Sequence, residues 1–329
     1  MSPRTLASSS VLFVLVAVIG WKFTTGPGGR TVAPTRAVPS PEVAAPTTGS
    51  EIEPPEMLIG EPSGRIFFTS YRVGNASQIF AMHADGSHVT PLKLGGSAAG
   101  SPDGELLACV QFYLDTNCFE IVLLDAEGNQ IERLTETPEE DSTAPAWSRD
   151  GSQIAFQSGD FNKPSIYVMN ADGTGRTALT AALGNDRHPC WSPNGDWIAF
   201  SSHRDGSEGV FVMDSEGGQL RRLTDASSSC GDPAWSPTGN RIACVAYHRS
   251  SRSYSLRIVD ADSGDWWTVI KDQERISGPD WSPSGDWLAF SMTANGQTDV
   301  YIVDARGGGL HNLTNESASD LDPSWTHSE

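Results

Sequence analysis

One motif, Trp-Ser-Pro-x-Gly, recurs along this chain and limits strongly what the chain can fold into. Its copies begin at Trp147, Trp191, Trp235 and Trp281, with Arg149 in place of proline in the first. A degenerate copy, Ser101-Pro102-Asp103-Gly104, lacks the tryptophan. Together with Trp325, the tryptophans follow one another at intervals of 44, 44, 46 and 44 residues. A period of about 40 to 50 residues is typical of propellers and of helical solenoids.

The content of each repeat is strand and not helix. Ser-Pro-x-Gly is typical of a tight turn, because proline fixes φ and glycine accepts the left-handed position. Unbroken apolar runs follow the turn, as at 198–200 and 210–213, which indicates strands buried on both faces. A short polar strand ending in Leu-Thr, as at 223–224, suits an outer edge. The repeat predicts a four-stranded antiparallel blade, and the count of second strands predicts an all-β, six-bladed β-propeller.

The order of these motifs resembles the repeat of the TolB-like, WD-like β-propeller family. Trp-Ser-Pro-x-Gly, then Ile-Ala-Phe, then Ile-Tyr-Val-Met-Asn-Ala-Asp-Gly and finally Leu-Thr carry the resemblance, which extends from about Met57 to the end of the chain. The resemblance implies the propeller fold. It implies little about function, because similar repeats occur in periplasmic proteins, in surface and sensor proteins and beside hydrolase domains.

The first blade is expected to take a strand from the far end of the chain. The first repeat has Leu58-Ile59-Gly60 where Pro-x-Trp belongs, whereas 322–325 is an inner strand with no blade after it. We therefore predict that the C-terminal strand completes the first blade and closes the ring, since closure removes two open edges.

The chain before the repeats is apolar at first and then rich in proline, glycine and threonine. The uncharged stretch 5–21 is at the lower edge of a membrane span and within reach of a secretory signal. Trp21-Lys22 resembles an interfacial anchor, which favours a membrane-spanning helix acting as a signal anchor over a cleaved signal peptide. We predict a signal anchor or signal peptide at 1–23, a disordered linker at 24–57 and the propeller at 58–329. The predicted location is the cell envelope, membrane-anchored or secreted and periplasmic, with a cytoplasmic propeller as the alternative.

Charge and cysteine content restrict the partners. The formal net charge is −19, which disfavours nucleic acid and leaves basic proteins, cations or sugars as easier ligands. Three of the five cysteines, Cys109, Cys190 and Cys244, fit small core positions. Cys190 with Cys230, and Cys109 with Cys118, are the pairs to test for a disulfide, and no spacing indicates a zinc site.

The loops between second and third strands and between blades vary, so function is expected on the face where they lie. One position there, three residues before each tryptophan, holds Ala144, His188, Asp232, Gly278 and Asp322. These side chains either cap the neighbouring backbone or contact a ligand. The predicted binding residues at the channel mouth are Asp141, Arg187, His188, His203, Arg204, Asp232, His248 and Asp322.

Signals for catalysis are poor, since the chain has no Gly-x-Ser-x-Gly, His-Glu-x-x-His or phosphate-binding loop. We predict a non-enzymatic propeller that binds a protein or peptide as scaffold or sensor, works as a monomer and carries no cofactor. The alternative is a carbohydrate-active enzyme with a metal held near His188. It is suggested by the resemblance of this propeller to those of some polysaccharide lyases. A sensor of a small ligand would instead need an apolar pocket in the channel.

Overall fold

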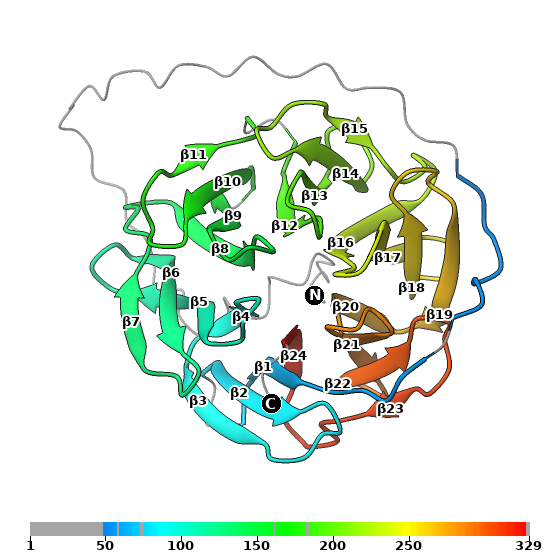
Figure 1. Cartoon of the computed structure of the whole chain (residues 1–329), viewed down its shortest axis with the longest axis horizontal. Helices are drawn as coiled ribbons and strands as arrows, with labels where there is room; N and C mark the ends of the chain where they lie inside the picture. The colour runs from blue at the N-terminus through cyan, green and yellow to red at the C-terminus, as the bar shows by residue number, and fades with distance from the viewer. Residues whose placement is uncertain (1–48, 58, 73–75, 161, 182–183, 327–329) are drawn as a thin grey trace, which may run out of the picture.

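The protein is a ring of six β-sheets around a central channel (Figure 1). The computed structural model describes residues 49–57, 59–72, 76–160, 162–181 and 184–326. Within them, 24 strands form six four-stranded antiparallel sheets, which confirms the predicted architecture. We number the sheets as blades I to VI.

In every blade the first strand lies at the channel and the fourth lies at the outer edge of the ring. Blade I consists of β24 (Asp320–Thr326), β1 (Arg65–Ser70), β2 (Gln78–His83) and β3 (Thr90–Leu94), and blade II of β4 (Gly96–Gly100), β5 (Leu106–Tyr113), β6 (Cys118–Asp125) and β7 (Gln130–Arg133). Blade III consists of β8 (Asp141–Trp147), β9 (Gln153–Gly159), β10 (Ser165–Asn170) and β11 (Thr177–Ala178), and blade IV of β12 (Arg187–Trp191), β13 (Trp197–Ser202), β14 (Gly209–Asp214) and β15 (Arg221–Arg222). Blade V consists of β16 (Ser229–Trp235), β17 (Arg241–His248), β18 (Ser253–Asp260) and β19 (Trp266–Gln273), and blade VI of β20 (Arg275–Trp281), β21 (Trp287–Ala294), β22 (Gln297–Asp304) and β23 (His311–Asn312).

Blade I takes its inner strand from the C-terminal part of the chain. β24 pairs antiparallel with β1, with Trp325 opposite Ile66. The Trp325 indole is only 6% exposed and donates from Nε1 to the carbonyl oxygen of Ser63 at 2.8 Å. In Figure 1 the red β24 accordingly lies beside the blue β1, at the channel.

Hydroxyl groups explain two of the sequence motifs. The Ser192 Oγ of Trp-Ser-Pro-x-Gly accepts the backbone N–H of Trp197 at 2.9 Å, and Gly195 closes the turn with φ of 77°. The threonine of Leu-Thr accepts a backbone N–H of the third strand of its blade, fourteen residues earlier, as Thr224 Oγ1 does from Val210 at 3.1 Å. Thr135, Thr180 and Thr314 do the same. Each threonine thus satisfies a strand amide beyond the end of the short fourth strand.

The hydrophobic core lies between blades. One cluster joins Ile166 and Val168 of blade III to Ile198, Phe200 and Phe211 of blade IV. Ile198, Phe200 and Phe211 have no exposed surface. Second and third strands are therefore buried on both faces, as their unbroken apolar runs predict.

The predicted N-terminal helix at 1–23 and most of the predicted linker lie outside the described residues. Among the residues that are described, no helix is long and apolar enough to cross a membrane. The described end of the predicted linker, residues 49–57, is hydrogen-bonded to blade V. Ile52 N donates to Trp266 O at 2.7 Å and Trp266 N to Ser50 O at 2.9 Å, so these residues cover the start of the eight-residue outer strand β19.

All five cysteines are free thiols, so neither predicted disulfide pair is bonded. Cys230 Sγ lies 3.5 Å from Cys244 Sγ on the adjacent strand of blade V, and both residues are buried. Cys109 and Cys244 have no exposed surface, as expected of small core residues.

Candidate functional site

A ring of six left-handed residues surrounds the channel at the loop side. One position in every inner strand, three residues before the tryptophan or, in β4, before Gly100, has a positive φ between 46° and 54°: Ser97, Ala144, His188, Asp232, Gly278 and Asp322. Each lies where the pairing register with the second strand shifts. Such a β-bulge turns a side chain out of its regular direction. Ser97 was missed from sequence because its repeat has lost the tryptophan.

The neighbouring blade holds this strained backbone in place. The backbone N–H of His188 donates to Gln157 Oε1 at 3.0 Å, and that of Asp232 donates to Ser201 Oγ at 2.9 Å. Ser97 and Asp322 are held in the same way by Thr69 and Ser291. Each acceptor belongs to the second strand of the preceding blade, so the ring is fixed by contacts between blades. The Asp232 carboxylate in turn accepts a hydrogen bond from the backbone of Gly278, the ring residue of the next blade.

His188 and Asp232 form an ion pair across blades IV and V, with Nδ1 2.7 Å from Oδ1. Burial opposes charge on both groups, yet the Asp232 carboxylate raises the pKa of His188 above its ordinary value. Likewise, burial alone would raise the pKa of Asp232, and the His188 imidazole holds it below its ordinary value. Two of the predicted site residues are therefore mutually stabilised charges in the channel wall.

Two other channel carboxyl groups have no such partner. Burial raises the pKa of Asp322 above its ordinary value, and its Oδ2 accepts a long hydrogen bond of 3.4 Å from Ser97 Oγ. Burial also raises the pKa of Asp280 to about 6. Asp280 accepts the backbone N–H groups of Trp281 and Trp325, each at 2.8 Å, and so connects β20 to β24. Within the described residues, no ion pair reaches either carboxylate.

The channel is a cavity of about 1190 Å³ that all six inner strands line. At its loop side the cavity extends over blades I to III, where second strands and loops also contribute to the wall. The wall there includes an apolar group that we call the shelf: Leu94, Phe112 and Phe119. Leu94 is 60% exposed and Phe112 37%, and the two phenylalanine rings meet edge to face with centroids 5.3 Å apart. The shelf was missed from sequence, because it lies outside the repeated motifs.

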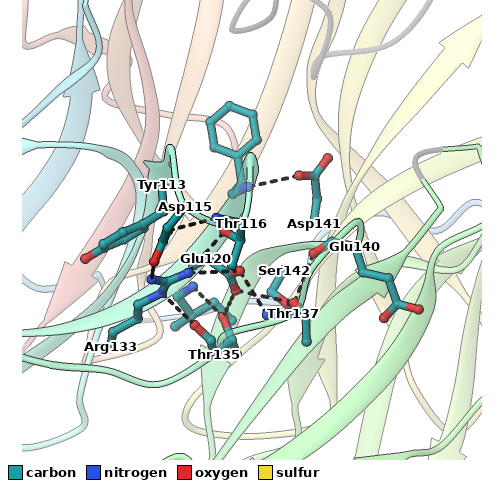
Figure 2. A network of polar contacts seen from close by, with 12 residues as sticks. Tyr113, Asp115, Thr116, Glu120, Arg133, Thr135, Thr137, Glu140, Asp141 and Ser142 are labelled. Atoms are coloured by element: carbon teal, nitrogen blue, oxygen red, sulfur yellow. Dashed lines mark hydrogen bonds and ion pairs between the residues drawn. The ribbon is translucent and has the colours of Figure 1, made fainter. Parts of the chain in front are cut away.

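Asp141 lies at this mouth beside a buried polar network (Figure 2). Its Oδ1 accepts the backbone N–H of Phe119 at 2.9 Å, which positions the shelf. Behind it, the fully buried Glu120 carboxylate accepts from Thr135 Oγ1 at 2.6 Å and from the backbone N–H of Thr137 at 3.0 Å. Asp141 therefore supports the mouth through the backbone of a residue that lines it.

Five of the eight predicted binding residues line the channel: Asp141, Arg187, His188, Asp232 and Asp322. His203, Arg204 and His248 lie outside its wall. The Arg204 Nη2 donates to both carboxylate oxygens of Asp186 at 2.9 Å, and its guanidinium lies over the Phe200 and Phe211 rings. Asp186 is fully buried, two residues before His188, so Arg204 positions the inner strand of blade IV.

No group of three or more His, Cys, Asp or Glu side chains is placed to hold a metal ion within the described ranges. His188 contacts Asp232 and His248 contacts Ser255, in separate parts of blades IV and V.

Comparisons with known proteins agree with this architecture. The family described as TolB beta propeller domain matches residues 97–266 and 223–328. The Tol-Pal system protein TolB of Actinobacillus pleuropneumoniae is 38% identical over 66 residues, which cover 20% of this chain and 16% of that protein. The matched segment thus spans about a sixth of the length of such curated relatives.

Solved structures extend the likeness over most of the ring. The crystal structure of TolB from Acinetobacter baumannii matches with a TM-score of 0.71 and 25% identity, over 81% of this chain and 67% of that one. An oligogalacturonate lyase from Vibrio parahaemolyticus matches with a TM-score of 0.54 and 13% identity, over 77% and 75% of the two chains. The second likeness concerns the fold alone.

Proposed function

Because this chain belongs to the TolB beta propeller domain family, we propose that it is a non-enzymatic binding protein of the cell envelope whose ligand is a protein or peptide segment seated in the loop-side mouth of the channel. The observation that carries the proposal is the construction of that mouth. The apolar shelf lines the same cavity as four polar ring residues, Ser97, His188, Asp232 and Asp322, whose backbone N–H groups are held by the preceding blades. Interfaces between proteins commonly combine apolar anchors with a few fixed polar groups.

The shelf offers the anchor. Leu94 and Phe112 remain exposed although most large apolar side chains of the described residues are buried. Leu114, which follows the strand β5 that contains Phe112, is 87% exposed. A partner that covered these three side chains would remove apolar surface from water at the edge of the channel.

The ring offers the polar contacts. Within the described residues Asp322 forms no ion pair, although the charges of His188 and Arg275 act on it from a distance. The Tyr71 hydroxyl, which lines the same cavity, is buried without a hydrogen-bond partner among those residues. Burial and the nearby Asp322 raise the pKa of Tyr71 to about 12, so the phenol stays protonated and can donate. A lysine, arginine or terminal amine of the partner near Asp322 would satisfy groups that the propeller leaves incomplete.

The wider context of the proposal comes from the relatives and from the sequence. Several relatives are named Tol-Pal system proteins, which supports an envelope location for this chain. We extend the proposal to the segment 1–23 as membrane attachment or export signal, to 24–57 as a linker, and to a monomeric propeller at 58–329 acting as scaffold or sensor.

Selection of displayed random peptides on the immobilised full-length chain tests the proposal. Asp322→Asn keeps a residue that tolerates positive φ, and Leu94→Ser changes an exposed side chain, so both variants should fold. Peptides selected on the native chain should bind each variant about tenfold or more weakly. They should bind Leu310→Ser, a control on another exposed leucine, with unchanged affinity. Peptides that bind all four chains equally would refute the mouth as the binding site.

Metal analysis addresses the enzyme alternative. Stoichiometric manganese, zinc or calcium in the purified full-length chain, lost on His188→Gln, would favour a metal-dependent enzyme over a binding propeller.

A further inference from the structure

A second cavity, of about 350 Å³, lies on the loop side of blade V, apart from the channel. It is formed where the connection before β16 meets the loop after β17. The side chains that define its chemistry are Ser228, Tyr247, His248, Arg249, Ser250 and Arg257. None of its lining residues is a carboxylate, although the chain has 41 acidic residues against 22 basic ones. A basic, hydroxyl-rich cavity on so acidic a protein requires a specific explanation.

Arg257 is held ready for an anion. Its guanidinium carbon lies 3.9 Å from the centre of the Trp266 ring, which fixes the plane of the group. Nη1 donates to Ser228 Oγ at a long 3.5 Å, the guanidinium also contacts the Cys230 thiol, and Nε is buried with no acceptor among the described residues. A half-buried guanidinium without a carboxylate is costly, and an anion would supply both the charge and the acceptors.

Three carboxylates of neighbouring segments, Glu208, Asp225 and Asp272, are already engaged and do not line the cavity. Glu208 Oε2 accepts from Ser229 Oγ at 3.5 Å. Asp225 Oδ1 accepts the backbone N–H of Ser227 at 2.7 Å, and Asp272 Oδ1 accepts from Ser253 Oγ at 3.0 Å. The thiol of Cys230, which also approaches Arg257, is a weak acceptor. No ion pair is formed by Arg257 or Arg249 in the part of the chain that the structure describes.

The remaining polar groups fit the same ligand. Arg249 is exposed at the rim, and His248 uses Nε2 toward Ser255 Oγ, which leaves its other ring nitrogen for a ligand. Hydroxyl groups of Ser228 and Ser250 add donors that suit oxyanions. Arginine forks match tetrahedral oxyanions, in which two oxygens can be contacted at once.

From these observations we propose that the blade V cavity binds a small molecule through a tetrahedral oxyanion, a phosphate or sulfate group, held by Arg257 and Arg249. The cavity is larger than a bare ion and lies at the lower end of the range for small-molecule sites, which leaves room for a small organic group beside the anion. The site is separate from the channel mouth, so it does not depend on the proposed function.

Isothermal titration of the full-length chain tests this site, with inorganic phosphate, inorganic sulfate and glycerol 3-phosphate as probes and sodium chloride at equal ionic strength as the control. We expect saturable binding of at least one oxyanion and none of chloride. Arg249→Ala and Arg257→Lys should each weaken it about tenfold or more, since each removes a charge-assisted contact or its fork geometry. The matched control Arg306→Ala, an exposed arginine on blade VI, should leave it unchanged.

The probes also separate the sources of the anion. Tighter binding of glycerol 3-phosphate than of inorganic phosphate assigns the site to phosphate esters, equal binding assigns it to the free ion, and a preference for sulfate assigns it to sulfated ligands. Absence of saturable binding, or binding that both arginine variants retain in full, would overturn the proposal. Arg249 lies at the surface, so a loss of binding in Arg249→Ala cannot arise from misfolding.

Discussion

Breaking the buried ion pair between Asp186 and Arg204 should destabilise the propeller by several kcal/mol, although neither residue lines the channel. The Asp186 side chain has no exposed surface and that of Arg204 is 16% exposed. The Arg204 Nε also donates to Ser202 Oγ at 2.9 Å. Removing one member leaves the other charge in a site that excludes water, which costs about 3 to 5 kcal/mol.

The two single substitutions should differ. Arg204→Ala leaves a fully buried carboxylate and removes the guanidinium from the Phe200 and Phe211 rings, so its cost should be near 5 kcal/mol, roughly the upper limit. Asp186→Ala leaves a guanidinium that keeps Ser202 and can turn toward water, so we expect about 3 kcal/mol. The double variant carries neither charge. Its cost should be about 2 kcal/mol or more below the sum of the two.

Equilibrium unfolding in urea, followed by the fluorescence of the ten tryptophans, measures these free energies. Glu140→Ala is the matched control, because its pair with Arg176 is 3.4 Å long and its side chain is 49% exposed. That substitution should change the free energy of unfolding by less than about 0.5 kcal/mol. Costs that add up in the double variant, or an Asp186→Ala cost no larger than the control, would refute the reasoning.

Three further predictions concern the ring. The free energy of unfolding gained from the His188 and Asp232 pair should be greatest near about pH 5. Because the pKa of His188 is raised, the stability that its charge contributes is lost as pH rises through the folded-state pKa of His188. Because the pKa of Asp232 is lowered, the stability that its charge contributes is lost as pH falls through the folded-state pKa of Asp232. Comparing the unfolding free energy of His188→Asn with that of the native chain from pH 4 to 8 measures both effects, and a difference that does not depend on pH contradicts the pair. Burial raises the pKa of Asp280 to about 6, so the protonated carboxyl is favoured in the folded state and its ionisation destabilises the fold. As pH rises from about 4 to 7, the unfolding free energy of Asp280→Asn should therefore increase by up to about 3 kcal/mol relative to that of the native chain. A difference between the two chains that does not change with pH would contradict this. Deleting 321–329 removes most of β24 and Trp325, and should lower the melting temperature by roughly 10 °C or more in calorimetry; an unchanged melting temperature would mean that this strand does not hold the ring.

The architecture could be predicted from sequence because its cause is local and repeated. Each Ser-Pro-x-Gly turn is satisfied within five residues, as Ser192 shows with Trp197, and each Leu-Thr pair within fourteen. Such short-range contacts repeat with the motif, so blade content and blade number can be read from spacing alone. The left-handed ring position was likewise visible as a fixed offset from the tryptophan, except at Ser97, whose repeat has lost the tryptophan.

The site could be predicted only in part, because its remaining features depend on contacts between blades. Arg204 and His203 lie in a loop of variable sequence, which is why they were predicted to bind a ligand. The Arg204 guanidinium instead pairs with Asp186, and no regular sequence spacing indicates that pair. The shelf arises because Leu94 and Phe112, which come from different blades, both line the loop side of the channel. The blade V cavity depends on how two loops approach each other. The disulfide pairs were predicted from spacing along the sequence, whereas the distance between strands decides which cysteines lie close together.

The most direct test of the central claim, that a partner docks at the loop-side mouth, is site-specific photo-crosslinking in the native cell. A photoreactive phenylalanine derivative at position 94, on the shelf, should give a discrete adduct with one protein. The adduct should be lost when Asp322→Asn is added, and the same derivative at position 310, another exposed leucine position, should give none. An adduct from position 310 and none from position 94, or an adduct at 94 that persists with Asp322→Asn, would contradict the account.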